Sequence, residues 1–503
     1  MTQLMLNGEP LTVDDVVAVA RGGQRVALGA EAAARVRVAR TLVEQVVAHG
    51  RPVYGITTGF GALSRVTIPR RELSELQRNL IRSHAAGVGA PLAPDVARAM
   101  MLVTAASLSR GASGARPELI AGLLDLLNHD ITPHIPSRGS VGASGDLAPL
   151  AHMALALIGE GEVLAPGGGC APAAEALAAA GLQPLPLEAK EGLALINGTH
   201  LMAGTAALLL HDAWQLLRAA EVAAAMSLDG ALGTHAPLDP RIHALRRQPG
   251  QQDCAARLRE LLEGSALPAS HRDDPRVQDP YTLRCIPQVL GAARDTLAYV
   301  GQVVAAELGA VTDNPLLFPD DNAILSGGNF HGQPLATVLD LLTIAIAQIA
   351  GFAERRIFLL LSAWEPEMRL PPFLTPQPGL QSGLMVAQYT AAALVVEIRA
   401  LAQPASVGSL PTSGGMEDWN SMGATAALQA LQALDMARSV VAIELLCAAQ
   451  SLDQHRPLRS GRGVEAAHAR IRAAVPPLRA DHPPAPDIAA ISRLIGEGVF
   501  DNS

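Results

Sequence analysis

The feature that most constrains the fold is a set of long helical patterns rich in alanine and leucine. They lie at about residues 200–229, 283–310, 334–362, 384–403 and 423–452. At 1.5 Å per residue, a helix of about thirty residues is roughly 45 Å long, well beyond the usual length in globular proteins. Such helices bury their apolar stripes only by lying side by side. The sequence therefore predicts an all-α protein built on a long-helix bundle.

The apolar stripes are broad, and aromatic residues make up only 3% of the chain, so the packing surfaces consist of leucine, alanine and valine. One bundle does not bury them all, and we expect an oligomer formed through these helices. We divide the chain into an N-terminal region 1–200 with polar loops, a central bundle 201–455 and a C-terminal helical segment 456–503, all within one integrated fold. Residues 159–188, rich in glycine and proline, are expected to form a small hairpin excursion.

Composition and charge narrow the class of protein and its partners. With 49% apolar and 17% charged residues, the chain can bury a large core. A net charge of −9 argues against nucleic acid or an anionic membrane as a partner. The longest apolar run, around 341–353, is too short to span a bilayer and predicts a buried helix. The absence of a secretion-signal pattern and of any CxxC pair among four cysteines favours a reduced, cytoplasmic protein.

Lys190 is the only lysine in the chain, and this excludes several reaction classes. A P-loop needs Gly-Lys-Ser/Thr, which does not occur, and a pyridoxal phosphate enzyme would need Lys190 for its Schiff base. The 14 histidines form no His-Glu-x-x-His pattern and no zinc or two-metal constellation, so no metal is expected. No Gly-x-Ser-x-Gly elbow occurs either. We interpret Lys190 as a structural residue near Asn197.

The tripeptide Ala143-Ser144-Gly145 can turn the backbone itself into an electrophile. In a tight non-helical turn, the amide nitrogen of Gly145 can attack the carbonyl carbon of Ala143. Loss of water, including the Ser144 hydroxyl, then leaves a methylidene-imidazolone ring. Glycine offers an unhindered nitrogen and backbone freedom, and alanine an uncrowded carbonyl. Asp146 follows at once and is a candidate proton acceptor for ring closure.

A second Ala-Ser-Gly occurs at 112–114 and serves as an internal control. It lies where one helix ends and another begins with proline and glutamate in its first turn, so it predicts an ordinary interhelix turn. The copy at 143–145 instead follows a stretch broken by prolines and glycines and precedes an apolar helix. Context therefore favours the copy at 143–145 as the reactive one.

Six polar islands interrupt the apolar patterns, and with the tripeptide they carry the chemistry. The islands are Tyr54–Gly61, Ser83-His84, Asn197-Gly198-Thr199, Gln278–Arg284, Gly327–Gln333 and Met416–Gly423. The motifs along this part of the chain, in and between the islands, are YGITTGFG, GSVGASGDLAPLAHM, KEGLALINGT, VQDPYTLRC, VTDNPL and GNFHG. In this order, over residues 50 to 430, the chain resembles the aromatic amino acid ammonia-lyase family, and most closely its histidine-specific members.

The resemblance implies a mostly α-helical homotetramer whose active sites are each assembled from three chains. It implies a prosthetic group, 4-methylidene-imidazol-5-one, formed from residues 143–145, with no pyridoxal phosphate, nucleotide or metal required. The substrate is then an aromatic L-amino acid, a small molecule that loses ammonia, with L-histidine giving trans-urocanate as the first expectation. The electrophile is needed because the β-hydrogen of an amino acid is not acidic and ammonia leaves poorly.

The resemblance also implies roles for individual residues. Tyr54 removes the β-proton, which requires that helix N-termini or cations lower the pKa of its phenol. Arg284 binds the substrate carboxylate in a bidentate pair, and Asp146 assists ring formation. The other expected catalytic residues are Asn197, Tyr281, Phe330 and Glu417. The expected substrate contacts are Ser83, His84, Asn197, Gln278, Arg284, Met385, Met416 and Glu417.

Selectivity is expected from His84 and Glu417, because both can bond an imidazole. The chain departs from the histidine-specific pattern at four positions: Gln333, Met416, Trp419 and Asn420. Asn420 is typical of phenylalanine-type enzymes. L-tyrosine, or several aromatic amino acids, is therefore the alternative substrate, and an aminomutase is a weaker variant.

Simpler interpretations stand beside these. Glu417 and Asp418 could cap the helix that begins near 423, and His200 and His331 are read as core or supporting residues. Three other classes of protein are a non-catalytic helical scaffold, a pyridoxal enzyme that uses Lys190, and a fumarase-like lyase. The Gly-Ser-Ser-x-Met-Pro loop of the last class does not occur in the sequence.

Overall fold

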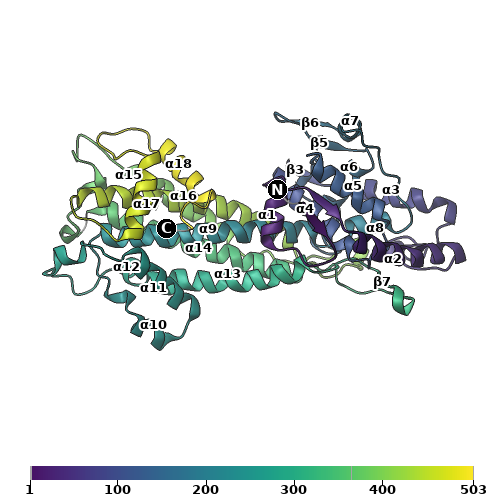
Figure 1. Cartoon of the computed structure of the whole chain (residues 1–503), viewed down its shortest axis with the longest axis horizontal. Coiled ribbons are helices and arrows are strands. Elements are labelled where there is room, and N and C mark those ends of the chain that lie inside the picture. The colour runs from purple at the N-terminus through teal and green to yellow at the C-terminus, as the bar shows by residue number, and fades with distance from the viewer. Residues whose placement is uncertain (1–2, 364, 502–503) are drawn as a thin grey trace. The chain divides into compact units, whose positions relative to one another are not determined.

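The long apolar patterns fold as helices in the computed structural model, which describes residues 3–363 and 365–501 (Figure 1). The predicted long helices correspond, to within a few residues, to α9 (His200–Gly230), α13 (Ile286–Leu308), α14 (Gln333–Ser362), α15 (Met385–Leu401) and α16 (Gly423–Gln454). The pattern predicted at 283–310 is divided, because the short helix α12 (Tyr281–Arg284) precedes α13. The all-α fold class is confirmed.

Two compact units are built from segments that interleave along the chain. Unit 1 contains Met1–His211, Gly301–Asp340 and Pro404–Leu428. Unit 2 contains Asp212–Val300, Leu341–Gln403 and Gln429–Ser503. The helices α9, α13, α14 and α16 each contribute residues to both units.

Unit 1 holds the shorter helices of the first two hundred residues. They are α1 (Val13–Ala20), α2 (Ala30–His49), α3 (Leu73–His84), α4 (Pro94–Ser109), α5 (Pro117–Asn128), α6 (Leu147–Leu157), α7 (Ala173–Ala179) and α8 (Glu191–Ile196). The helix α4 is buried along nearly its whole length and packs against α1 and α5. The helix α6 packs against α3 and α8. The ends of α3 and α8 and the start of α6 are therefore held close together.

The strands of unit 1 are short and form two-stranded pairs. Their bounds are β1 (Leu4–Leu6), β2 (Val26–Leu28), β3 (Val88–Pro91), β4 (Pro136–Arg138), β5 (Glu162–Leu164), β6 (Cys170–Pro172), β7 (Leu316–Phe318) and β8 (Ala323–Leu325). The pair β1 and β2 is parallel, and β3 with β4, β5 with β6 and β7 with β8 are antiparallel. The hairpin expected within 159–188 is β5 and β6, which α7 follows directly.

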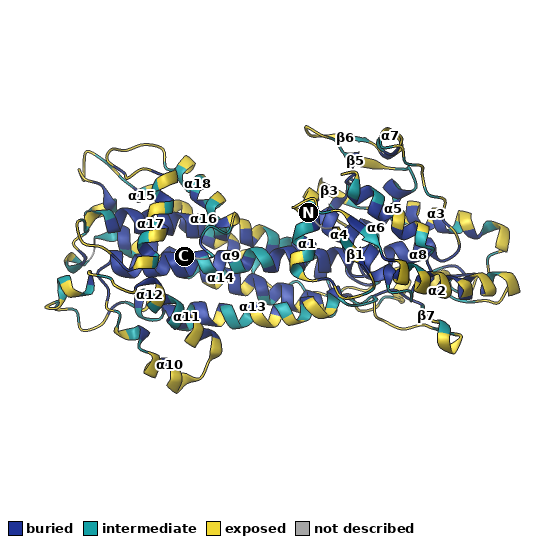
Figure 2. Cartoon of the chain, viewed as in Figure 1, coloured by how far each residue is buried: buried dark blue, intermediate teal, exposed yellow. Residues whose placement is uncertain are grey.

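Unit 2 packs the remaining length of the long helices with α10 (Pro240–Arg246), α11 (Pro249–Leu261), α12, α15, α17 (Arg462–Ala474) and α18 (Ala485–Gly496). Runs of buried alanine along α9 allow close helix approach, and Figure 2 shows most of α9 and α16 as buried. Two charge pairs cross this apolar core. Arg356 Nη2 donates to Glu444 at 2.8 Å, and Arg294 Nη2 donates to Glu221 at 2.8 Å. A buried pair of this kind sets which helices are neighbours more than it adds stability.

The apolar run 341–353 lies inside α14, whose bounds agree with the helical pattern predicted at 334–362. The whole helix has 30 residues and is long and apolar enough to cross a membrane by length and composition, so the expectation that the run is too short was wrong. The helix continues beyond Asp340 and Glu354, the polar residues that bound the run. Its most apolar window is 61% buried in the structure, which is how a core helix of a globular protein behaves.

Candidate active site

The tripeptide 143–145 lies in a buried turn that only glycine can complete. Gly142 and Gly145 have φ of +66° and +73°, a region that side chains with a Cβ rarely adopt. Gly145 pairs with Gly198, and a Cβ at Gly145 would lie 2.0 Å from the Gly198 carbonyl oxygen. Ala143 is buried, and the turn is tight and non-helical as ring closure requires.

Asp146 ends this turn and is fully buried. Its carboxylate accepts hydrogen bonds from Ser140 Oγ at 2.9 Å and from the backbone N–H of Met202 at 3.0 Å, in the first turn of α9. Burial raises the pKa of Asp146 to about 7, while these hydrogen bonds oppose the rise. A carboxyl group with a pKa near neutrality beside the tripeptide can both take up and release a proton.

The second tripeptide behaves as predicted. Residues 112–114 connect α4 to α5, and Ser113 is buried. Within the described part of the chain, the hydroxyl of Ser113 has no hydrogen-bond partner. It lines none of the cavity described next.

A cavity of about 750 Å³ in unit 1 collects most of the predicted site residues. Predicted residues in its lining are Tyr54, Ser83, His84, Ser144, Asn197, Phe330, Met416 and Glu417. The apolar remainder includes Leu63, Val66, Leu76, Leu80, Leu147 and Leu193. Segments that are far apart in sequence meet here because α3, α6 and α8 pack together. The volume suits a small aromatic ligand with a few polar contacts.

Glu417 lies in a loop opposite the tripeptide, and each oxygen of its carboxylate accepts a hydrogen bond. Ser144 Oγ donates to Glu417 Oε1 at 3.0 Å, and Thr412 Oγ1 donates to Oε2 at 2.8 Å. The backbone of Thr412 also pairs with that of Glu417. The buried Asn420 donates from Nδ2 to Thr412 Oγ1 at 3.2 Å and so supports the same loop. The interpretation of Glu417 as a cap of α16 was wrong, because its carboxylate bonds Ser144 and Thr412 instead.

Asn197 is oriented by a buried charge pair. Its Nδ2 donates to Asp313 Oδ1 at 3.2 Å and to the Asn314 carbonyl at 3.0 Å. Lys190 Nζ donates to the other oxygen of Asp313 at 2.6 Å, and both side chains are buried. Lys190 does not line the cavity, which agrees with its structural interpretation and leaves no Schiff-base nucleophile there. Asp313 and Asn314 were missed as site residues, although both lie in the VTDNPL motif.

The environment of Tyr54 differs from the prediction. Gly61 N–H donates to the phenol oxygen at 3.4 Å. Burial raises the pKa of Tyr54, and the negative charges of Glu417 and Asp313 raise it further. We expected neighbouring groups to lower the pKa of Tyr54, and for its neighbours in unit 1 this expectation was wrong. The main reason is the burial of the phenol, to which the neighbouring carboxylates add.

His84 ends α3 and presents one ring nitrogen for binding. Its Nδ1 lies 2.8 Å from the Leu80 carbonyl oxygen, which requires a proton on Nδ1. Burial lowers the pKa of His84, so the ring is neutral and Nε2 is left as an acceptor. Ser83 Oγ, 3.0 Å from the same Nδ1, supports this orientation.

Four predicted residues belong to unit 2 and do not line the cavity: Gln278, Tyr281, Arg284 and Met385. Tyr281 is 69% exposed, and the guanidinium of Arg284 stacks on its ring at 4.5 Å from the centroid. Gln278 lines a smaller cavity of about 240 Å³ in unit 2. Among the described residues, no arginine or lysine lines the large cavity.

Among the four departures from the histidine-specific pattern, Met416 lines the cavity. His331 Nε2 lies 3.1 Å from the Trp419 carbonyl, and Gln333 begins α14 outside the cavity lining. His200 is buried beside Gly198, and burial lowers its pKa to about 3. These histidines support neighbouring segments, as expected.

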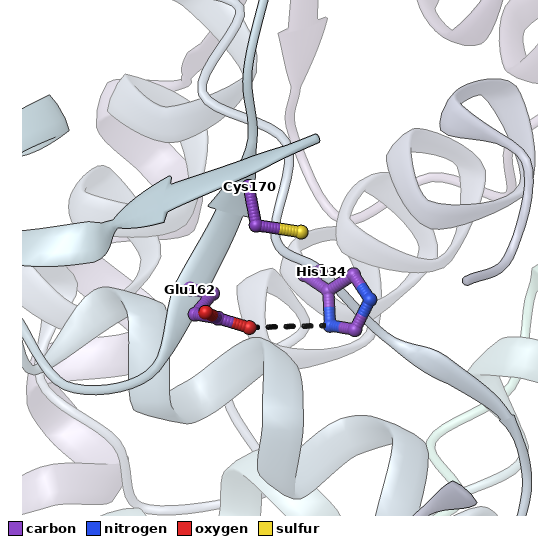
Figure 3. A group of neighbouring side chains, drawn as sticks. All are labelled: His134, Glu162 and Cys170. Atoms are coloured by element: carbon purple, nitrogen blue, oxygen red, sulfur yellow. Dashed lines mark ion pairs between the residues drawn. The ribbon is translucent and has the colours of Figure 1, made fainter. Parts of the chain in front are cut away.

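The sequence predicted no metal-binding group, but three possible metal ligands lie close together in the structure. His134, Glu162 and Cys170 place one ligand atom each within 4.8 Å of one another (Figure 3). No sequence motif indicated this group, because its members lie in three separate strand-like segments.

The protein is a carbon–nitrogen lyase by its helical fold, by its relatives and by its cavity, where a phenol, an imidazole, an amide and a carboxylate lie around a tight Ala-Ser-Gly turn. The chain belongs to the aromatic amino acid lyase family, whose model matches residues 11–473. It is 52% identical over 510 residues to a histidine ammonia-lyase of Anaeromyxobacter dehalogenans, with 100% of each chain covered. It is 53% identical to one of Symbiobacterium thermophilum, covering 98% of this chain and 96% of that protein.

Solved structures agree with this assignment. Histidine ammonia-lyase from Trypanosoma cruzi has a TM-score of 0.92 at 39% identity, covering 99% of this chain and 94% of that one. Tyrosine aminomutase from Streptomyces globisporus has a TM-score of 0.95 at 38% identity, covering 99% and 98%. The fold is therefore shared by enzymes of different substrates, and the substrate has to be argued from the cavity.

Proposed function

We propose that the chain is a histidine ammonia-lyase that converts L-histidine to trans-urocanate and ammonia. The observation that carries this proposal is the position of Ser144. Its hydroxyl lies in a turn that excludes any Cβ at residue 145, and it faces Glu417 across 3.0 Å in the cavity. The names of the relatives at 52% and 53% identity support the same substrate.

The residues present fit the self-formed prosthetic group. Gly145 has positive φ and close backbone contact with Gly198, Ala143 is buried, and Asp146 holds a carboxyl with a pKa of about 7 beside them. Once formed, the methylidene-imidazolone supplies an electrophile that activates the amino group as a leaving group. Nucleotide, metal and pyridoxal phosphate have no part in this proposal.

The protein's own residues then bind the substrate and move its proton. Neutral His84 accepts the imidazole N–H at its Nε2, and Glu417 accepts a second hydrogen bond or faces the protonated ring. Phe330 packs beside the ring, and Asn197 bonds the substrate from its fixed orientation. Tyr54, in its phenolate form, takes the β-proton as the Cα–N bond breaks, which leaves a trans double bond and ammonia.

We infer that Arg284 and Tyr281 complete the cavity from another copy of the chain. A substrate carboxylate needs a cation, and the described lining of the cavity holds no arginine or lysine. Arg284 is held ready by its stacking on exposed Tyr281 in unit 2. A cation beside Tyr54 would also oppose the rise of its pKa. A cytoplasmic homotetramer with shared sites fits these needs and the family.

A panel of L-histidine, L-tyrosine and L-phenylalanine, followed by ultraviolet absorbance of the unsaturated product, tests the substrate. Preference for L-histidine is expected, and turnover of L-tyrosine alone would overturn it. Intact mass tests the prosthetic group, because ring formation removes two waters per chain. Ser144→Ala should have its unmodified mass and no activity, whereas the matched Ser113→Ala should remain two waters lighter and active. An active Ser144→Ala variant would refute the mechanism.

A further inference from the structure

The group of His134, Glu162 and Cys170 lies on one face of a small antiparallel ribbon. The strand β5 pairs with β6 on one side, with Leu164 opposite Cys170. On its other side Val163 pairs with Pro133, and His134 N–H donates to the Glu162 carbonyl at 2.9 Å. Alternate residues of a strand share a face. The registers therefore direct all three side chains to the same face.

The three side chains converge, and His134 and Glu162 make a long ion-pair contact. His134 Nδ1 lies 3.9 Å from Glu162 Oε2, which is beyond hydrogen-bond distance (Figure 3). The ligand atoms of all three residues lie within 4.8 Å of one another. Small side-chain rotations bring such atoms to a common ion, because Glu162 and Cys170 are exposed and free to move.

We propose that His134, Glu162 and Cys170 bind a zinc ion. Thiolate, imidazole and carboxylate are the three ligand types of zinc sites, whereas magnesium and calcium prefer oxygen alone. The thiolate and the carboxylate balance the double charge of the ion when the thiol proton is released to solvent.

The site would clamp both ends of the segment that carries the active-site turn. Residues 135–161 run from His134 through β4, the turn at 143–145 and α6 to β5. A bound ion joins the start of this segment to the hairpin at its end, and binding only to the folded state stabilises it. This zinc has no part in the elimination reaction, because none of its three ligands lines the cavity.

The test uses the full-length enzyme stripped of metal with a chelator and then titrated with Zn²⁺ alone. We expect saturable uptake of about one Zn²⁺ per chain by calorimetry and a higher unfolding temperature. The Co²⁺-loaded protein should show thiolate-to-cobalt charge-transfer absorption. Cys170→Ser should abolish that absorption, and Glu162→Gln and His134→Gln should each weaken Zn²⁺ affinity at least about tenfold.

Matched controls separate this site from general surface binding. The exposed residues His129 and Glu175 provide the variants His129→Gln and Glu175→Gln, and Cys285→Ser removes another thiol. All three should bind Zn²⁺ as the unaltered chain does. The proposal is overturned if the unaltered chain shows no saturable uptake. It is equally overturned if uptake survives Cys170→Ser or is lost in Cys285→Ser.

Discussion

Asp313 joins Lys190 to Asn197 by using its two carboxylate oxygens separately. Oδ2 accepts from Lys190 Nζ at 2.6 Å, and Oδ1 accepts from Asn197 Nδ2 at 3.2 Å. Burial lowers the pKa of Lys190, and the facing carboxylate opposes that change. The only lysine of the chain therefore acts on the cavity through the orientation of Asn197.

Lys190→Met should destabilise the fold by about 3–5 kcal/mol, because it leaves the buried carboxylate of Asp313 without its partner. Activity should fall as well, since Asn197 loses its fixed neighbour. Chemical unfolding and steady-state kinetics measure the two effects. Lys190→Met combined with Asp313→Asn should recover part of the stability. Arg71 forms an exposed ion pair with Glu72, and Arg71→Met should lower the free energy of unfolding by less than about 1 kcal/mol. Equal losses for Arg71 and Lys190 would count against this role.

Asp146 should make stability fall as pH rises. Burial raises its folded pKa from 3.8 to about 7, so the native state holds the proton more tightly than the unfolded chain. Its contribution is fully present below pH 3.8 and is lost as pH rises through about 7, a change of roughly 4 kcal/mol. The stability of the unaltered chain relative to Asp146→Asn should therefore decrease between about pH 5 and 7. A constant difference across that range would exclude this titration.

Gly145→Ala should prevent ring formation. The added Cβ would meet the Gly198 carbonyl oxygen at 2.0 Å, and the residue would have to keep φ at +73°. Intact mass should remain that of the unmodified chain, and activity should be lost. Gly168 has φ of +103° with open space around it, so Gly168→Ala isolates the backbone strain and should cost only ~1–2 kcal/mol. A Gly145→Ala chain that is two waters lighter would contradict the close contact.

Glu417→Gln should reduce kcat/KM for L-histidine by about 10- to 100-fold, because glutamine keeps an acceptor oxygen but removes the charge that strengthens the hydrogen bond to the imidazole N–H. The loss should be much smaller with L-phenylalanine, which has no ring N–H. Parallel kinetics with both substrates measure the difference. The exposed neighbour Asp418, replaced by Asn, is the matched control and should leave both values unchanged. An equal loss on both substrates would assign Glu417 to the loop structure rather than to recognition.

The long helices and the reactive turn could be predicted because their signals are local. The helix α9 spans 200–230 where its apolar pattern predicted 200–229. The two Ala-Ser-Gly copies differ in their flanking glycines and prolines, and these decide whether a turn forms between helices or inside a polar loop. The candidate residues at the cavity could also be predicted, because the order of their motifs is a property of the sequence.

The remaining relationships depend on which distant segments pack together. Sequence spacing does not reveal that Asp313 meets Lys190, that carboxylates face Tyr54, or that strand register aligns His134 with Cys170. Helix periodicity and turn residues are short-range properties, so the sequence by itself determined the helical class, the candidate electrophile and a set of candidate site residues. Burial, charge neighbours and pKa are properties of long-range packing, and only the tertiary structure decided them.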